Sequence, residues 1–245
     1  MLELTGSVTR IQASTFNPRD PSTSSRYLQW WAAAMVALPV FIQAPWVRQQ
    51  PFSACLFTGV ILCVGILLQL KAHRELADAG ALLVGLSGSW LAGCLFWGWL
   101  RAAPIWHLPV ESIALPWALT GLRSRWQLGC AFYLASLLGT VCTDITMILA
   151  RVMEAWPVIV TAPLATAPTL LHDTATRLLE PLPSLVVCLA ATGVVLLSRQ
   201  AHNRAADTKY AQGWAVAASV LLATLVVDGS FFFGALMQPR LSGLI

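Results

Sequence analysis

Charged side chains are scarce in this sequence of 245 residues. Asp, Glu, Lys and Arg together make up 11% of it, whereas a soluble domain carries about 25%. Hydrophobic residues make up 57%, an excess that excludes a disordered chain, because disordered chains lack the apolar surface needed to fold. These proportions predict an all-α, polytopic helical membrane protein and argue against a soluble enzyme.

Clustered basic residues and the motifs of soluble catalysis are missing as well. The 15 basic residues stand singly or in pairs between apolar runs, which is typical of a membrane protein's orientation signals and argues against nucleic-acid binding. The six cysteines form no CxxC pair and no Cys/His cluster with zinc spacing, so no metal site is predicted. P-loop, GxGxxG, GxSxG and HExxH motifs are all absent.

Apolar stretches long enough to cross a bilayer recur along the chain. A helix needs about 20 mainly apolar residues to cross the hydrocarbon core. Prolines at positions 104, 109 and 116 interrupt one of the stretches, so this fourth segment is either a kinked span or a re-entrant segment. About seven transmembrane helices are predicted, at residues 27–43, 52–70, 76–100, 104–122, 127–149, 182–198 and 211–236.

The predicted spans form a single transmembrane domain, residues 27–238. A polar arm, residues 1–26, precedes the domain and lacks the features of a cleavable signal peptide. A short tail, residues 239–245, follows it. Between the fifth and sixth spans, residues 152–181 contain three prolines in an apolar run, which predicts an interfacial loop with a short amphipathic helix at residues 168–180.

The distribution of basic residues predicts the orientation. If residues 104–122 span the membrane, ten basic residues lie on the side of the N-terminus and five on the other. If they do not span, the count is eight against seven, which is no signal. The positive-inside rule therefore favours seven spans with a cytoplasmic N-terminus.

Small residues recur at every fourth position of the third span. They are Ala77, Ala81, Gly85, Ser89 and Gly93. Such a stripe lets helix backbones approach closely in lipid. We interpret it as a helix-packing surface rather than a ligand groove.

Three acidic residues, Glu111, Asp144 and Asp228, lie inside predicted spans. A charge at the bilayer centre costs roughly 2.5–3.5 kcal/mol or more, so such residues need a reason to be there. A rise of about 1.5 Å per residue places all three in the half of the membrane away from the N-terminus. The similar runs LLGTVCTD and LLATLVVD end in Asp144 and Asp228, which also predicts that these two carboxyls share a depth.

Other polar and aromatic residues belong to the same depth. We predict an outward-facing polar pocket lined by Trp97, Arg101, Trp106, His107, Glu111, Asp144 and Asp228. The three acids are the candidate catalytic residues, Arg101 would neutralise one carboxylate, and His107 would shuttle a proton or bind a pigment or metal. The alternatives are a purely structural hydrogen-bond network for the acids and an interfacial belt for the tryptophans.

Four runs of the chain resemble an uncharacterised family of cyanobacterial integral membrane proteins. The runs are LPVFIQAPWVR (38–48), SGSWLAGCLFWGWLRAAPIWHLPVESIALPWAL (87–119), FYLASLLGTVCTDI (132–145) and LVVDGSFF (225–232). This resemblance implies a thylakoid or plasma membrane and no known activity. A local run, HLPVES (107–112), is similar to the Pro-x-Glu-Glu motif of membrane-embedded carotenoid cyclases, with Ser112 in place of the second Glu.

Three functions are compatible with these residues. The favoured one is binding of pigment or lipid, or assistance to a photosynthetic complex, in a cyanobacterial membrane whose lipids are the other partners. The second is a membrane-embedded enzyme that acts on a polyisoprenoid, carotenoid or lipid, with Glu111 as the proton donor. The third is a small proton- or ion-coupled transporter that uses the three carboxyls.

Overall fold

The computed structural model describes residues 21–163, 165–207 and 210–237. Within these ranges the regular structure is helical and contains no strand, so the all-α prediction is confirmed. Residues 1–20 of the predicted arm and the whole predicted tail, 239–245, lie outside the described residues. The remaining arm residues, 21–26, belong to the first helix.

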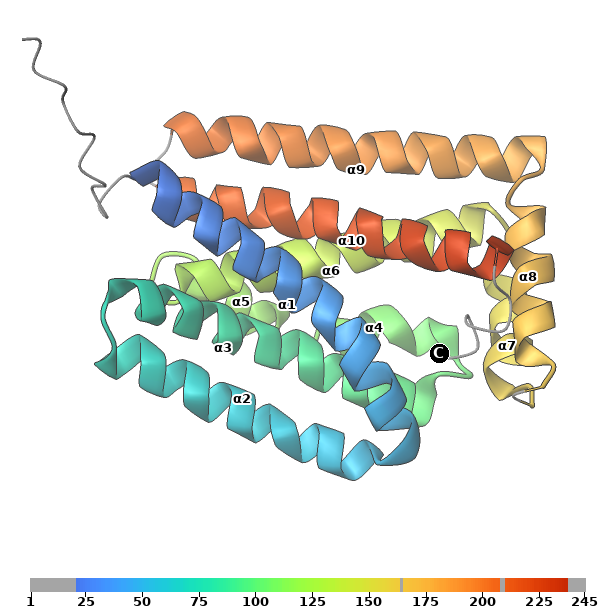
Figure 1. The fold of residues 1–245 in the computed structure, drawn as a ribbon, viewed down its shortest axis with the longest axis horizontal. Helices are drawn as coiled ribbons and strands as arrows, with labels where there is room; N and C mark the ends of the chain where they lie inside the picture. Colours follow the sequence, from blue (N-terminus) through green and yellow to red (C-terminus); the bar gives the residue numbers. More distant parts are fainter. Residues whose placement is uncertain (1–20, 164, 208–209, 238–245) are drawn as a thin grey trace, which may run out of the picture.

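Six helices in the described part of the chain are long and apolar enough to cross a membrane. They lie side by side, and Figure 1 shows the chain running back and forth through them. The chain is therefore a polytopic helical membrane protein. The spanning elements are α1 (Pro21–Gln49), α2 (Pro51–Lys71), α3 (Arg74–Leu95) with its π-helical continuation η1 (Phe96–Leu100), α6 (Gln127–Leu149), α9 (Pro181–Asp207) and α10 (Ala211–Met237).

Two short helices, α7 (Trp156–Thr161) and α8 (Ala167–Arg177), lie across one end of this bundle (Figure 1). Both fall in the segment expected to be an interfacial loop. We call this end the α7–α8 end. It is the end at which α1, η1, α6 and α10 finish and at which α2 and α9 begin.

The proline-rich fourth segment crosses the bundle in pieces. It consists of η2 (Pro104–Trp106), α4 (His107–Glu111) and α5 (Leu115–Gly121). The segment starts near the α7–α8 end, where η1 finishes, and leads back to the start of α6 at the opposite end (Figure 1). There the Gln69 amide of α2 donates to the carbonyl of Arg125, 2.8 Å away. The fourth segment therefore runs from one end of the bundle to the other in short pieces, and we call it the broken span.

The break between α4 and α5 is held by Tyr133 of α6. The Tyr133 hydroxyl accepts a hydrogen bond from the Ala114 backbone N–H at 3.1 Å and donates one to the Glu111 carbonyl. Backbone groups freed from a helix at membrane depth must find a partner inside the protein, because lipid offers none. One side chain thus satisfies both sides of the break.

Two helices extend beyond their predicted ends. The predicted end of the first span at residue 43 is wrong, because α1 continues through Pro45 to Gln49. It stops before Pro51, which disfavours a helical conformation at the preceding residue. Helix α9 runs past residue 198 to Asp207. Its basic last turns can leave the hydrocarbon for water, and the Arg204 guanidinium lies 5.0 Å from the centre of the Trp214 ring.

The stripe of small residues on α3 packs against neighbouring helices, as predicted. A Cβ added to Gly85 would lie 2.2 Å from the Gly129 carbonyl oxygen of α6, and one added to Gly129 would lie 2.1 Å from the Ala81 carbonyl oxygen. Further along, Gly93 faces the buried amide of Gln43 on α1. The close contact of α3 with α6 holds the third span against the helix that carries Asp144.

Candidate functional site

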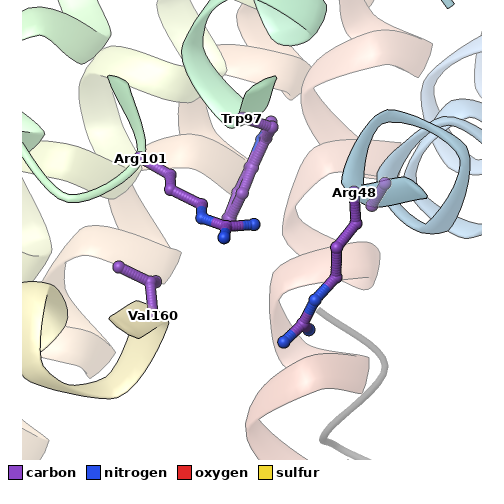
Figure 2. A pocket seen from close by; sticks show the side chains of 5 residues that line it. Arg48, Trp97, Arg101 and Val160 are labelled. Atoms are coloured by element: carbon purple, nitrogen blue, oxygen red, sulfur yellow. The ribbon is translucent and has the colours of Figure 1, made fainter. Parts of the chain in front are cut away.

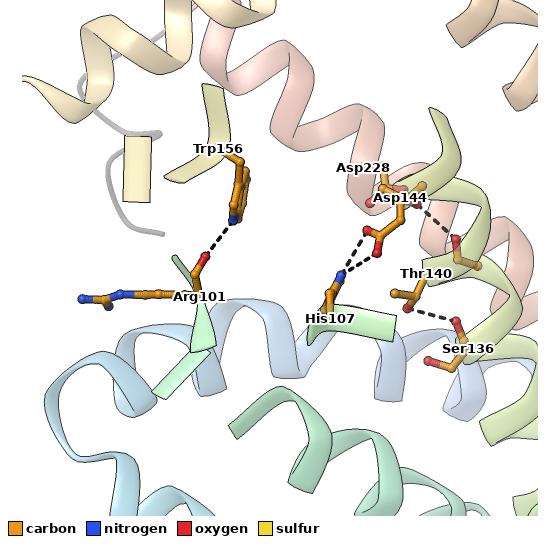
Figure 3. Close-up of polar contacts among 9 residues, drawn as sticks. Arg101, His107, Ser136, Thr140, Asp144, Trp156 and Asp228 are labelled. Atoms are coloured by element: carbon orange, nitrogen blue, oxygen red, sulfur yellow. Dashed lines mark hydrogen bonds and ion pairs between the residues drawn. The ribbon is translucent and has the colours of Figure 1, made fainter. Parts of the chain in front are cut away.

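A contact between a histidine and a carboxylate joins the broken span to α6 in the half of the bundle nearer the α7–α8 end. His107 Nδ1 lies 2.9 Å from Oδ2 and 3.0 Å from Oδ1 of Asp144 (Figure 3). Asp144 is only 5% exposed, and the His107 side chain is 21% exposed. A carboxylate can only accept hydrogen bonds, so with Asp144 ionised the proton on Nδ1 is the shared one.

The His107 ring is fixed from a second side by Phe96. The two ring centres lie 4.3 Å apart, with 33° between the ring planes, and Phe96 is fully buried. Pro104 starts the turn that brings His107 back against η1. The imidazole is therefore oriented both by an aromatic ring and by a carboxylate.

Asp228 of α10 lies beside this pair. The Thr143 hydroxyl donates to Asp228 Oδ2 at 2.6 Å, and the Thr143 hydroxyl oxygen also lies 3.1 Å from the Gly139 carbonyl oxygen. Because Thr143 precedes Asp144 on α6, the carboxyls of Asp144 and Asp228 are close enough to interact electrostatically (Figure 3). The structure thus brings together the two aspartates expected to share a depth.

Glu111 completes the group from the last residue of α4. It follows His107 by four positions, one helical turn, and interacts electrostatically with both His107 and Asp144. We call His107, Glu111, Asp144 and Asp228 the His107–acid cluster. The cluster draws on three separate elements, α4, α6 and α10.

Arg101 does not take the place expected for it. Its side chain points away from the acids, while its backbone carbonyl accepts a hydrogen bond from the Trp156 indole N–H at 3.0 Å (Figure 3). Within the described ranges no ion pair joins Arg101 to a carboxylate. The partner of Asp144 is His107, which corrects the expectation that Arg101 would neutralise an acid.

The seven residues predicted to line a single pocket do not lie together. Arg101 and Trp97 line a small pocket together with Ala44, Arg48 and Val160, and this pocket contains none of the three acids (Figure 2). Trp106 is 53% exposed, on the outer surface of the broken span. Of the seven residues expected to line one pocket, four form the His107–acid cluster, two line the separate pocket and Trp106 lines neither.

Sequence reasoning missed Tyr133, Thr143 and Phe96. Thr143 could have been found from the sequence, because it precedes the membrane-embedded Asp144 and its hydroxyl can donate a hydrogen bond to another embedded acid such as Asp228. Tyr133 and Phe96 carry no such signal, since nothing in the sequence pairs them with the broken span. In the described residues no group of three or more His, Cys, Asp and Glu is arranged to hold a metal ion.

A family model spans most of the chain. The family described as "Protein of unknown function (DUF3120)" matches residues 32–236. The chain belongs to this family. All four residues of the His107–acid cluster lie within the matched part of this DUF3120 protein. No curated protein and no solved structure matches the chain.

Proposed function

We propose that this DUF3120 protein binds a metal-containing tetrapyrrole pigment through His107. The observation that carries the proposal is the contact between His107 Nδ1 and the Asp144 carboxylate. Metal-binding histidines typically donate their other ring N–H to a carboxylate, which sets the tautomer and the ring orientation. The same arrangement in His107 would leave Nε2 for the pigment metal.

A tetrapyrrole fits a site with one histidine. The macrocycle supplies four ligands of its own, so a single imidazole is enough for the metal. The broken span also presents large apolar side chains to the surroundings, namely Ile105, Trp106, Ile113 and Trp117. Aromatic and branched side chains of this kind suit the flat face of a pigment.

His107→Ala is expected to abolish pigment binding. The full-length protein, purified from its native membrane in mild detergent, should show the absorption bands of a tetrapyrrole and yield the pigment by mass spectrometry. The variant should lose these bands because the metal loses its protein ligand. His202→Ala is the matched control, since His202 is exposed on α9 outside the cluster. A colourless parent, or a variant as coloured as the parent, would overturn the proposal.

A second candidate function is proton-coupled transport. The hydrogen bond from Thr143 to Asp228, next to the His107–Asp144 pair, favours it, since chains of acids and histidine carry protons in membrane transporters. Asp228→Asn should then reduce proton uptake by proteoliposomes under an imposed potential by about tenfold or more. Asp173→Asn, on the exposed face of α8, is the control. Equal uptake by empty liposomes excludes this candidate.

We further propose that the membrane is a photosynthetic cyanobacterial one, the thylakoid or plasma membrane, with the α7–α8 end facing away from the cytoplasm. With the broken span counted as a crossing, the number of crossings is odd and the two termini lie on opposite sides, so the basic residues decide the orientation. In the described residues seven basic positions lie toward the opposite end and four toward the α7–α8 end. The seven are Arg26, Lys71, Arg74, Arg123, Arg125, Arg199 and Arg204, and the four are Arg48, Arg101, Arg151 and Arg177.

A reporter fused after Ile245 is expected to lie outside the cytoplasm. An enzyme active only in the oxidising exterior should be active there, while a fusion after Arg125, between the fourth span and α6, should be inactive. The reverse pattern would contradict this orientation. A third fusion after Arg101, just before the fourth segment, should be active, because Arg101 and Ile245 lie on the same side only if that segment crosses. If the pattern is reversed, the Arg101 fusion separates the two causes: it is inactive if the N-terminus faces outward and active if the fourth segment does not cross.

A further inference from the structure

Two arginines from distant parts of the chain face one small pocket at the α7–α8 end. Arg48 comes from the last turn of α1, and Arg101 follows the last residue of η1. Trp97, Ala44 and Val160 complete the lining (Figure 2). The pocket thus combines two cationic groups with an aromatic and two aliphatic surfaces.

Local structure fixes Arg101 and Trp97 on this pocket. Trp97 belongs to the π-helical turn that ends the third span, and Arg101 directly follows this turn. Such turns are frequent at functional sites. The Trp156 indole N–H bonds the Arg101 carbonyl at 3.0 Å, and the Trp156 ring meets the Trp97 ring edge-on at 5.6 Å. The backbone that carries the arginine is therefore anchored to the α7 segment.

The charge of Arg101 is not balanced by an acid in the described part of the chain. The three embedded acids belong to the His107–acid cluster, from which the Arg101 side chain points away (Figure 3). A guanidinium presents five N–H donors in a planar fork, which suits the oxygens of a phosphate or similar anion. The pocket is therefore suited to an anion that comes from outside the chain.

We propose that this pocket binds the anionic headgroup of a membrane lipid. The pocket lies where α1 and η1 end, which is the level of the headgroups for helices of spanning length. Phe52 and Trp99 stack edge-on near the same level, as in an interfacial aromatic belt. Basic pockets between transmembrane helices bind anionic lipid headgroups, and Trp97, Ala44 and Val160 offer an apolar surface for the glycerol and upper acyl chain.

The test is lipid binding to full-length protein stripped of lipid in detergent and followed by native mass spectrometry. Phosphatidylglycerol should bind more tightly than phosphatidylcholine, which lacks the net negative charge. Arg101→Gln should weaken phosphatidylglycerol binding about tenfold, the loss of one charge-assisted contact. Arg177→Gln should leave binding unchanged, because Arg177 lies exposed on α8 at the same end of the bundle but outside the pocket.

Further arms separate the lipid from other sources and from folding defects. Arg101→Lys keeps the charge and should retain part of the affinity, which a folding defect would not show. The pigment content of the Arg101 variants, measured in parallel, should equal that of the parent. A failure of the lipid proposal is therefore distinguishable from a failure of the His107 proposal. If inorganic phosphate binds as tightly as phosphatidylglycerol, the ligand of the pocket is a soluble anion and the lipid proposal is wrong. Equal binding by the parent and Arg101→Gln would overturn the site.

Discussion

Gly129→Ala is expected to lower the thermal unfolding temperature of the detergent-solubilised protein by roughly 2–12 °C. The added Cβ would lie 2.1 Å from the Ala81 carbonyl oxygen and 3.0 Å from the Gly85 backbone nitrogen. Both are backbone atoms of α3, so no side chain can rotate away and the two helices must separate. Overpacking of this kind costs about 1–3 kcal/mol or more, and each kcal/mol is about 2–4 °C in a chain of this size.

Gly193→Ala on α9 is the matched control for this prediction. It makes the same substitution inside a spanning helix, but a Cβ there would have nothing within 4 Å. Its unfolding temperature should stay the same or rise slightly, because alanine favours a helix over glycine. Equal unfolding temperatures for the two variants would contradict the close contact of α3 with α6.

Asp144→Ala is expected to reduce the free energy of unfolding by about 2–3 kcal/mol. The substitution leaves His107 without its acceptor in a half-buried position next to Phe96. Removing one partner of a buried ion pair costs about 3–5 kcal/mol, and of a neutral hydrogen bond about 1–3 kcal/mol. The expected value lies in the upper part of the hydrogen-bond range and below the ion-pair range, because the imidazole can lose its proton when its partner is gone.

Asp144→Asn should cost less than Asp144→Ala, because the amide oxygen can still accept from Nδ1. A double-mutant cycle with His107→Ala isolates the interaction. The two single substitutions each leave a buried group without its partner, so the double variant should be more stable than their sum predicts by about 1–3 kcal/mol. Additive effects in chemical or thermal unfolding would show that the pair contributes no stability.

The same substitution carries a functional expectation. If His107 binds the pigment metal, Asp144→Ala should lower pigment affinity by about 10–100-fold, the usual effect of removing the carboxylate behind a metal-binding histidine. Pigment is measured per folded protein, so this loss is separate from the loss of stability. Asp228→Asn should leave the pigment in place, since Asp228 meets Thr143 and not the imidazole.

Much of the fold follows from the sequence. The apolar run at residues 127–149 corresponds to α6 (Gln127–Leu149). The fourth segment, which the basic count required to cross, runs from one end of the bundle to the other. Helix ends were less predictable. Proline was expected to stop the first span at residue 43, yet α1 continues through Pro45, because a proline removes one backbone hydrogen bond and can kink a helix without ending it.

The sequence predicted how deep in the membrane the side chains of the candidate site lie, but not the direction in which they point. Counting residues along a helix gives the level of a side chain, and on that basis Glu111, Asp144 and Asp228 were assigned to one half of the membrane. The direction in which a side chain points depends on helix rotation. The π-helical turn Phe96–Leu100 shifts the register of the third span, so Arg101 turns away from the acids and His107 takes its place.

The most direct test of the central claim, that His107 is the ligand of a bound pigment, is chemical rescue of His107→Gly. The glycine variant, expressed and purified with and without imidazole, is compared with the parent by absorption spectroscopy in the same detergent. The pigment bands should be lost in the variant and return with imidazole, which replaces the missing side chain. Bands that persist in the variant without imidazole, or a parent without any bands, would contradict this claim.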